Sequence, residues 1–448
     1  MIEIHPKAIE SFDAQANELL LLLKPYKFSD QQKPKDSSSR SAEYYQNLPE
    51  EKVLKHSISG FVDGFGNRLS RYFNYKGSSV GLDGDDYSQL IDFLENLYHK
   101  KEINNFLSRK FLEHCSFDWF ECKYKGEVDS SVSFTKYLFE KAENVVKETK
   151  ISIPISYLSI EASFKLGNLT YEFYDKKYFD DLLSKLNESK EDKITEKEYE
   201  GLRKDYQGVV FASKTITAEK ERAVELIIDE VDKQIKLIRC FSPTTFLPTV
   251  DSYFNRMGHT LIPHNHSFIF DGKHPTINTF RDKSIDYYFP FTLKLLADYE
   301  KTGFIKIFDI INKSDLSDFE DHLLNSAFLF SHAIESKNFQ DKLVYSLVSL
   351  ETLLLKDTSE PIQNTIGLRL SFLTRNNITD RKAVIELIKR AYKLRSSYIH
   401  HGKKSDDLEV LQKLQHLVWQ SIVNLTNSIN KFDSQAAFLE YIEELILT

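Results

Sequence analysis

The stretch at 387–403 reads LIKRAYKLRSSYIHHGK, and its periodicity decides how the last third of the chain folds. When Val384 is set as the origin and each residue turns a helix by about 100°, the apolar residues that follow cluster within about 80° of it. They are Leu387, Ile388, Ala391, Leu394 and Tyr398. A stripe of this kind predicts an amphipathic helix over 381–401 that packs on its neighbours through this face.

The same helical period recurs around this stretch, whereas the middle of the chain alternates with a period of two. The other helices predicted in the last third cover 318–336, 339–356, 362–375, 407–431 and 434–446. Apolar and polar residues alternate over 158–166 and 169–173, on either side of Gly167-Asn168, which predicts a β-hairpin with a two-residue turn. A further strand is expected at 208–212 and a helix at 218–239.

These patterns predict an α+β protein in which a mixed α/β N-terminal region precedes an all-α C-terminal helical bundle. Residues 1–150 are expected to be mostly helical, with a turn at 78–86 (SSVGLDGDD). Residues 151–303 are expected to form an α/β domain, and 304–448 the bundle.

Composition favours a cytoplasmic protein. The chain has 448 residues and three cysteines, too few for a disulfide framework. Its longest leucine run, at 19–23, is far too short to span a membrane. The net charge is −8, yet residues 380–404 carry eight Lys and Arg against two acidic residues, which is +6 locally. This local excess is compatible with a nucleic-acid partner or with a solvated helix face.

Arg395 falls at about 20° on the same helical projection, in the middle of the apolar stripe. A buried guanidinium is very costly without a partner, so it needs a carboxylate or a specific interface. The best candidate is Glu351, which is itself a charge inside an apolar helical run, LVYSLVSLETLLL. One interpretation is therefore an ion pair within the bundle that has no other role. Arg369, inside IGLRLSFL, is expected to form another core ion pair.

His400 falls at about 160° and His401 at about 260°, away from Arg395. Gly402 suits the position just past the end of a helix, and Ser405 or Asp406 could cap the next one. His400 would then lie in the last turn, where the helix dipole favours an imidazolium. A single histidine there is commonly a cap. Arg395 and His400 can share a site only if the helix ends or bends before the histidine, or if a second subunit completes it.

An arginine followed after four to six residues by a histidine, on a late helix of a small bundle, resembles the HEPN superfamily. The segments LVSLETLLL (347–355), GLRLSFL (367–373) and LIKRAYKLRSSYIHHGK (387–403) are similar to the Apea-like HEPN group of bacterial anti-phage abortive-infection proteins. The resemblance covers residues from about 320 to 431.

This resemblance implies a metal-independent endoribonuclease without a cofactor, in a homodimer formed through the bundle. Arg395 would bind the scissile phosphate, and His400 would act as general base on the ribose 2′-OH or as general acid on the leaving oxygen. The implied product is a 2′,3′-cyclic phosphate. Ser396 stands where the superfamily often has Asn, Asp or His, and it can still donate a hydrogen bond. Supporting roles in catalysis or RNA binding are implied for Glu351, His401, Lys393, Lys403 and Lys404.

Other readings of the sequence stay open. The bundle could be a non-catalytic module that dimerises or binds RNA or a nucleotide, with effector function elsewhere. In the ribonuclease hypothesis, by contrast, the N-terminal region would sense a phage-derived trigger or restrain the nuclease. Two groups of potential metal ligands lack the paired spacing of a zinc site, so no metal is expected. These groups are His114, Cys115 and Cys122, and His259, His264, His266 and His274.

Overall fold

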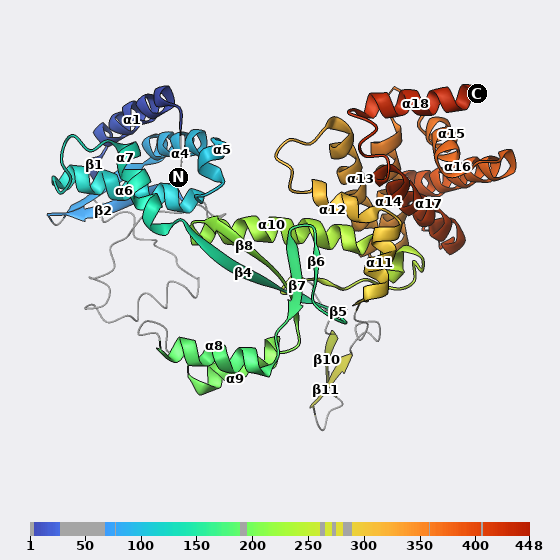
Figure 1. The fold of residues 1–448 in the computed structure, drawn as a ribbon, viewed down its shortest axis with the longest axis horizontal. Coiled ribbons are helices and arrows are strands. Elements are labelled where there is room, and N and C mark those ends of the chain that lie inside the picture. The colour runs from blue at the N-terminus through green and yellow to red at the C-terminus, as the bar shows by residue number, and fades with distance from the viewer. Residues whose placement is uncertain are drawn as a thin grey trace. The chain divides into compact units, whose positions relative to one another are not determined.

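The computed structural model has an α+β fold (Figure 1), as predicted. The residues that it describes are 4–26, 68–76, 78–188, 195–259, 265–270, 275–280, 289–357, 359–404 and 406–448. The chain divides into two compact units. Unit 1 comprises Met1–Thr149 and Thr215–Glu225, and unit 2 comprises Lys150–Lys214 and Leu226–Thr448. The boundary drawn from sequence at residue 303 lies inside unit 2.

Unit 1 is a helical layer with a small antiparallel sheet. Its helices are α1 (Pro6–Leu21), α4 (Gly84–Tyr98), α5 (Lys101–Asn104), α6 (Arg109–Lys125) and α7 (Phe134–Val145). The sheet has the order β1-β3-β2, with β1 at Lys24–Tyr26, β2 at Ser70–Tyr75 and β3 at Ser78–Asp83. Trp119, Phe120 and Phe134 are fully buried in the core. Aromatic side chains of this size each bury a large apolar area and contribute strongly to the stability of a core.

The turn predicted at 78–86 is wrong, because most of this segment is the central strand of the sheet. β3 pairs with both β1 and β2. A Cβ atom added at Gly81 would lie 2.0 Å from the carbonyl oxygen of Arg71, so a residue without a side chain is required at this crossing. Glycine in a strand commonly marks such a close backbone approach. Gly81, one of the residues that suggest a turn in the sequence, is therefore required here for the close packing of two strands.

The predicted β-hairpin at Gly167-Asn168 is confirmed. β6 (Phe164–Leu166) pairs with β7 (Leu169–Phe173), and Leu166 faces Leu169 across the turn. Gly167 has φ of +55°, which glycine adopts without strain. The hairpin belongs to a five-stranded sheet in the order β6-β7-β8-β4-β9. The other members are β4 (Lys147–Ser156), β8 (Val210–Ala218) and β9 (Asn255–Arg256).

The first arm of that hairpin is shorter than predicted. Residues 158–166 do not form one strand, because β5 (Leu158–Ile160) leaves the sheet and pairs in parallel with β12 (Phe289–Phe291). The carboxylate of Glu161 accepts a hydrogen bond from the backbone N–H of Leu293, which holds the chain on this second path. The remaining strands, β10 (Asn265–Phe270) and β11 (Pro275–Phe280), form a separate hairpin.

The strands of the five-stranded sheet are connected by the helices α8 (Lys176–Glu188), α9 (Glu196–Tyr206) and α10 (Lys220–Arg239) and by the 3₁₀ turn η2 (Pro243–Thr245). Two more helices lead into the bundle. They are α11 (Leu293–Lys301) and α12 (Ile307–Ile310), which are separated by the 3₁₀ turn η4 (Phe304–Lys306).

The all-α bundle is also confirmed, since the described residues beyond Phe291 contain helices and no strand. The expected helix at 407–431 ends early, at Thr426. The bundle helices are α13 (Asp318–Glu335), α14 (Phe339–Leu354), α15 (Ile362–Thr374), α16 (Ile378–His401), α17 (Leu408–Thr426) and α18 (Gln435–Leu447). Figure 1 shows these six helices gathered together in unit 2.

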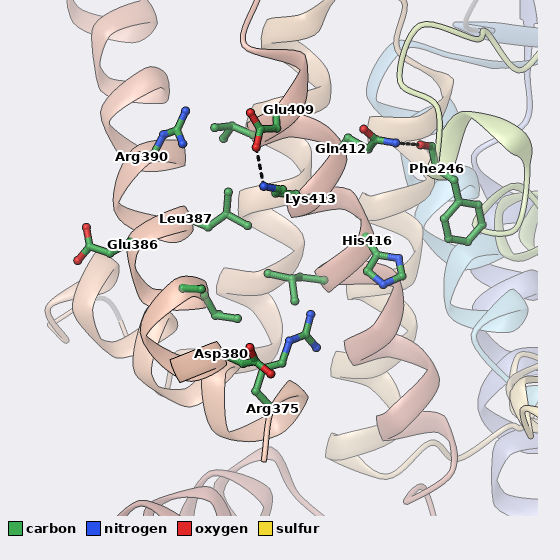
Figure 2. Close-up of a pocket in the computed structure, with 14 residues that line it drawn as sticks. Phe246, Arg375, Asp380, Glu386, Leu387, Arg390, Glu409, Gln412, Lys413 and His416 are labelled. Atoms are coloured by element: carbon green, nitrogen blue, oxygen red, sulfur yellow. Dashed lines mark hydrogen bonds and ion pairs between the residues drawn. The ribbon is translucent and has the colours of Figure 1, made fainter. Parts of the chain in front are cut away.

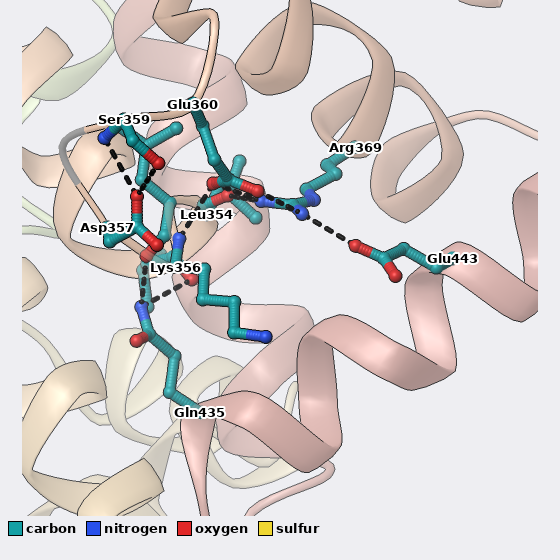
Figure 3. Close-up of polar contacts among 10 residues, drawn as sticks. Leu354, Lys356, Asp357, Ser359, Glu360, Arg369, Gln435 and Glu443 are labelled. Atoms are coloured by element: carbon teal, nitrogen blue, oxygen red, sulfur yellow. Dashed lines mark hydrogen bonds and ion pairs between the residues drawn. The ribbon is translucent and has the colours of Figure 1, made fainter.

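Two polar side chains close the C-terminal end of α14 (Figure 3). Arg369 is buried and donates to the carbonyl oxygen of Leu354 at 2.6 Å, to both oxygens of Glu360, and to Glu443 at 2.7 Å. The amide of Gln435 donates to three further carbonyl oxygens, those of Thr352, Leu353 and Leu355. The predicted core ion pair of Arg369 is confirmed. These bonds satisfy carbonyl groups that a helix end otherwise leaves unpaired.

Replacement of Arg369 should destabilise unit 2 strongly. Burial alone would raise the pKa of Glu360, but hydrogen bonds from Arg369 and the backbone lower it, so an unpaired charge remains when the arginine is removed. We expect Arg369→Ala to cost about 3 kcal/mol. Glu443→Gln should cost less than about 1 kcal/mol, because this partner is largely exposed.

The measurement is urea unfolding followed by Trp419 fluorescence in a Trp119→Phe background, which leaves one tryptophan, in α17. Equal losses of stability in the two variants would contradict the assignment of Arg369 as the centre of this network.

Candidate functional site

Helix α16 runs without interruption through both histidines of the motif. It ends at Gly402, which has φ of +62° and donates its N–H to the carbonyl oxygen of Tyr398, as predicted. His400 therefore lies in the last turn but still inside the helix. The next helix is capped by Asp407, which accepts from the N–H of Val410, so the cap expected at Asp406 is wrong. Ser405, the other expected cap, lies outside the described residues.

Because the helix neither ends nor bends before His400, Arg395 and His400 point about 140° apart around its axis. One copy of the chain does not bring the two side chains to one face. A site that uses both residues needs a second subunit, which was one of the conditions derived from the sequence.

Arg395 forms the predicted ion pair with Glu351. Its Nη1 lies 2.8 Å from the Oε1 atom of Glu351, on α14. The hydroxyl of Tyr392 donates to the same oxygen, also at 2.8 Å. The side chains of Arg395 and Glu351 are 25% and 19% exposed, so the pair is partly open to solvent. The Nε atom of Arg395 is buried and has no hydrogen-bond partner among the described residues.

The phenol of Tyr392 is a fixed hydrogen-bond donor in this cluster. Its pKa is raised mainly by burial and further by the negative charge of Glu351. It therefore stays protonated at neutral pH and holds the carboxylate from one side while Arg395 holds it from the other.

The opposite side of α16 carries a row of exposed lysines with a histidine and a serine among them, which we call the basic face. On the helical projection, its members lie within an arc of about 60°. All are exposed, and they are Lys382, Lys389, Lys393, Ser396 and His400. One acidic residue, Glu386, pairs with Lys389 at 2.7 Å. The basic face thus brings together three of the residues singled out from the sequence, namely Lys393, Ser396 and His400.

His401, Lys403 and Lys404 are also exposed, at the end of the same helix. The imidazole rings of His400 and His401 lie 6.5 Å apart. The structure therefore divides the predicted site residues into two sets. The Arg395–Glu351 pair faces the bundle, and the others lie on the basic face or at its end.

A groove between α16 and α17 was not predicted from the sequence (Figure 2). It has a volume of about 650 Å³ and is lined by apolar residues of both helices and by charged residues at its rim. The rim includes Arg390, which pairs with Asp407, and Lys413, which pairs with Glu409. Neither Arg395 nor His400 lines it. In the sequence, the groove is marked only by the i,i+4 spacing of Glu409 and Lys413. This spacing is common on solvated helices and does not identify a groove.

His416 lies at the end of this groove beside two aromatic rings. Its imidazole is stacked 5.7 Å from Trp419 and lies 6.0 Å from Phe246. Figure 2 shows His416 on the side of the groove that faces Phe246. The pKa of His416 is lowered from 6.5 by burial first and then by the positive charge of Arg375.

Trp419 should report the protonation of His416. An imidazolium stacked on an indole quenches its fluorescence, so emission in a Trp119→Phe background should fall on acidification with a midpoint below 6.5. Since the unfolded state binds this proton more readily, the stability of unit 2 should also fall as pH drops below 6.5. His416→Gln should abolish the fluorescence transition. A midpoint above 6.5 would contradict the lowered pKa.

No group of three or more His, Cys, Asp or Glu residues in the described part of the chain could hold a metal ion. Two members of the predicted histidine cluster, His264 and His274, lie outside that part. None of the described helices is both long and apolar enough to cross a membrane.

Comparisons with protein-family models, curated proteins and solved structures gave no match.

Proposed function

We propose that this chain is a metal-independent endoribonuclease, the cytoplasmic effector of bacterial anti-phage abortive infection, with the region before residue 304 sensing a phage trigger or restraining the bundle. The observation that carries the proposal is the basic face, which sets the exposed imidazole of His400 in line with three lysines. RNA is a polyanion whose binding depends on such rows of cations. A histidine among them is the group best suited to move protons at neutral pH.

The reaction needs a proton acceptor, a proton donor and a cation at the phosphate. An imidazole of His400 removes the proton from the ribose 2′-OH, and the 2′-oxygen attacks the phosphorus. As the bond between phosphorus and the 5′-oxygen breaks, the His400 imidazolium gives its proton to that oxygen, and a 2′,3′-cyclic phosphate remains. The Arg395 guanidinium stabilises the charge that develops on the phosphate oxygens. Since α16 is unbroken, this guanidinium belongs to the second copy in a homodimer.

Partial exposure of Arg395 is consistent with this role. Glu351 and Tyr392 fix the guanidinium from the bundle side, while a quarter of its side chain stays open. Ser396, His401, Lys393, Lys403 and Lys404 would contact the RNA along the basic face and beyond its end.

An RNase assay on single-stranded RNA in the presence of EDTA tests the proposal. His400→Ala and Arg395→Ala should each lower cleavage by about 10²- to 10⁴-fold, the contribution typical of a positioned acid, base or charge. The products of the wild-type chain should end in a 2′,3′-cyclic phosphate.

His99→Ala is the matched control, because it removes another exposed histidine, at the end of α4 in unit 1. It should leave cleavage unchanged. Undiminished cleavage by His400→Ala and Arg395→Ala would overturn the proposal. Mixing the two inactive variants should restore part of the activity, since some mixed dimers contain one intact Arg395/His400 pair.

The Arg395–Glu351 ion pair itself favours a second candidate, a non-catalytic bundle that dimerises or binds RNA or a nucleotide. On this hypothesis the pair has only a structural role. Glu351→Leu alone should cost about 2 to 3 kcal/mol, since it leaves a partly buried guanidinium unpaired. The double variant Glu351→Leu/Arg395→Leu should recover most of that loss and, if the chain binds RNA without cutting it, should retain salt-dependent RNA binding. Loss of a measured cleavage activity in this stable double variant would exclude the second candidate.

A further inference from the structure

Unit 1 contains a cavity of about 770 Å³ between β2, α4 and α6. We call it the basic pocket, and its charged lining residues are Arg68, Arg71, Arg109, Lys110, Glu95 and Glu113. Among the described lining residues, four cations against two carboxylates give a net charge of +2, in a chain whose net charge is −8. The volume is within the range of small-molecule sites, which is about 300 to 1,000 Å³.

Two guanidinium groups converge on one carboxylate in this pocket. Arg68 and Arg71 each place Nη1 at 3.1 Å from the same oxygen of Glu113, and the hydroxyl of Tyr87 donates to that oxygen at 3.0 Å. One carboxylate cannot neutralise two arginines. Among the described residues, a unit of positive charge therefore remains at this end of the pocket.

Arg71 is fixed from several sides. Its Nη2 lies 2.9 Å from the Nδ1 atom of His114, and its guanidinium lies 4.8 Å from the ring centre of Phe117. Its side chain is 15% exposed, whereas that of Arg68 is 40% exposed. A planar guanidinium held in this way is ready to form paired hydrogen bonds with a phosphate, at little further cost in side-chain entropy.

The other end of the pocket is closer to neutral. Glu95 receives two bonds from Arg109, from Nε at 2.7 Å and from Nη2 at 2.9 Å. Lys110 pairs with Glu221 at 2.9 Å but remains mostly exposed. Between the two ends, Ile91 and Leu94 provide an apolar wall, and Ile91 is unusually exposed for its type. An exposed apolar residue beside surplus charge matches a ligand that has both an anionic and an apolar part.

We propose that the basic pocket binds a small organic phosphate of nucleotide size. Its phosphate oxygens accept hydrogen bonds from Arg68 and Arg71, and its base or other apolar part lies against Ile91. This inference does not depend on ribonuclease activity of the bundle.

Calorimetric titration of the full chain tests the proposal, with ribonucleoside 5′-mono- and triphosphates and inorganic tripolyphosphate as probes. At least one nucleotide should bind to the wild-type chain. Arg68→Gln should weaken that binding about tenfold, the loss expected for one charge-assisted contact. Ile91→Ser should weaken nucleotide binding but leave tripolyphosphate binding unchanged. Both changes are at partly exposed side chains, so the fold should tolerate them.

Lys136→Gln on α7 is the control, because it removes one exposed cation of unit 1 that does not line the pocket. It should not change affinity. Absence of binding by every probe would overturn the proposal, as would equal weakening by Arg68→Gln and Lys136→Gln. Preferential binding of tripolyphosphate would overturn the assignment to an organic phosphate of nucleotide size.

Discussion

The unbroken helical repeat of α16 is the constraint on which the candidate site depends. Val384, Ile388 and Ala391 are buried, and they commit one side of this helix to the bundle. At about 100° per residue, the same packing turns Arg395 toward α14 and turns His400 toward solvent. The separation of the two residues is therefore a consequence of the core and not of a local loop. Any chemistry that joins them requires a second copy of the chain, so activity and association are coupled in the proposed enzyme.

Much of the bundle could be predicted from the sequence, and the reason is physical. A helix that buries a stripe must repeat its apolar residues every three or four positions, which is visible without any structure. A charged side chain on such an apolar face needs an oppositely charged partner, and few oppositely charged residues lie on the apolar faces of the other helices. The pair Arg395–Glu351 followed from this argument. The groove between α16 and α17 could not be predicted, since it depends on how two helices diverge and on Phe246, which is distant in sequence.

Local composition misled where long-range packing decides the backbone. In β3, Gly81 is required by the close approach of β2, yet glycine and serine in sequence indicate a turn. In β5, three residues leave an alternating segment to pair with β12, more than a hundred residues later. The basic pocket combines β2, α4 and α6 in the same way. Such arrangements depend on partners that no local pattern identifies, and function is often located in them.

Two arginines of the bundle, Arg369 and Arg395, differ in exposure and in the partners that hold them. Arg369 is 5% exposed, and its donors meet a carbonyl oxygen and two carboxylates. Both of its Nη atoms donate hydrogen bonds to oxygen atoms of the protein. Arg395 is 25% exposed, is held by one carboxylate, and keeps Nε without a partner among the described residues. A buried donor without a partner is costly. Arg239, which is 3% exposed, also has a buried Nε without a partner among the described residues, so exposure is what separates Arg395 from the structural arginines. In the proposed enzyme an anion would contact the guanidinium at the exposed quarter of the Arg395 side chain, and a phosphate is the anion whose oxygens match it best.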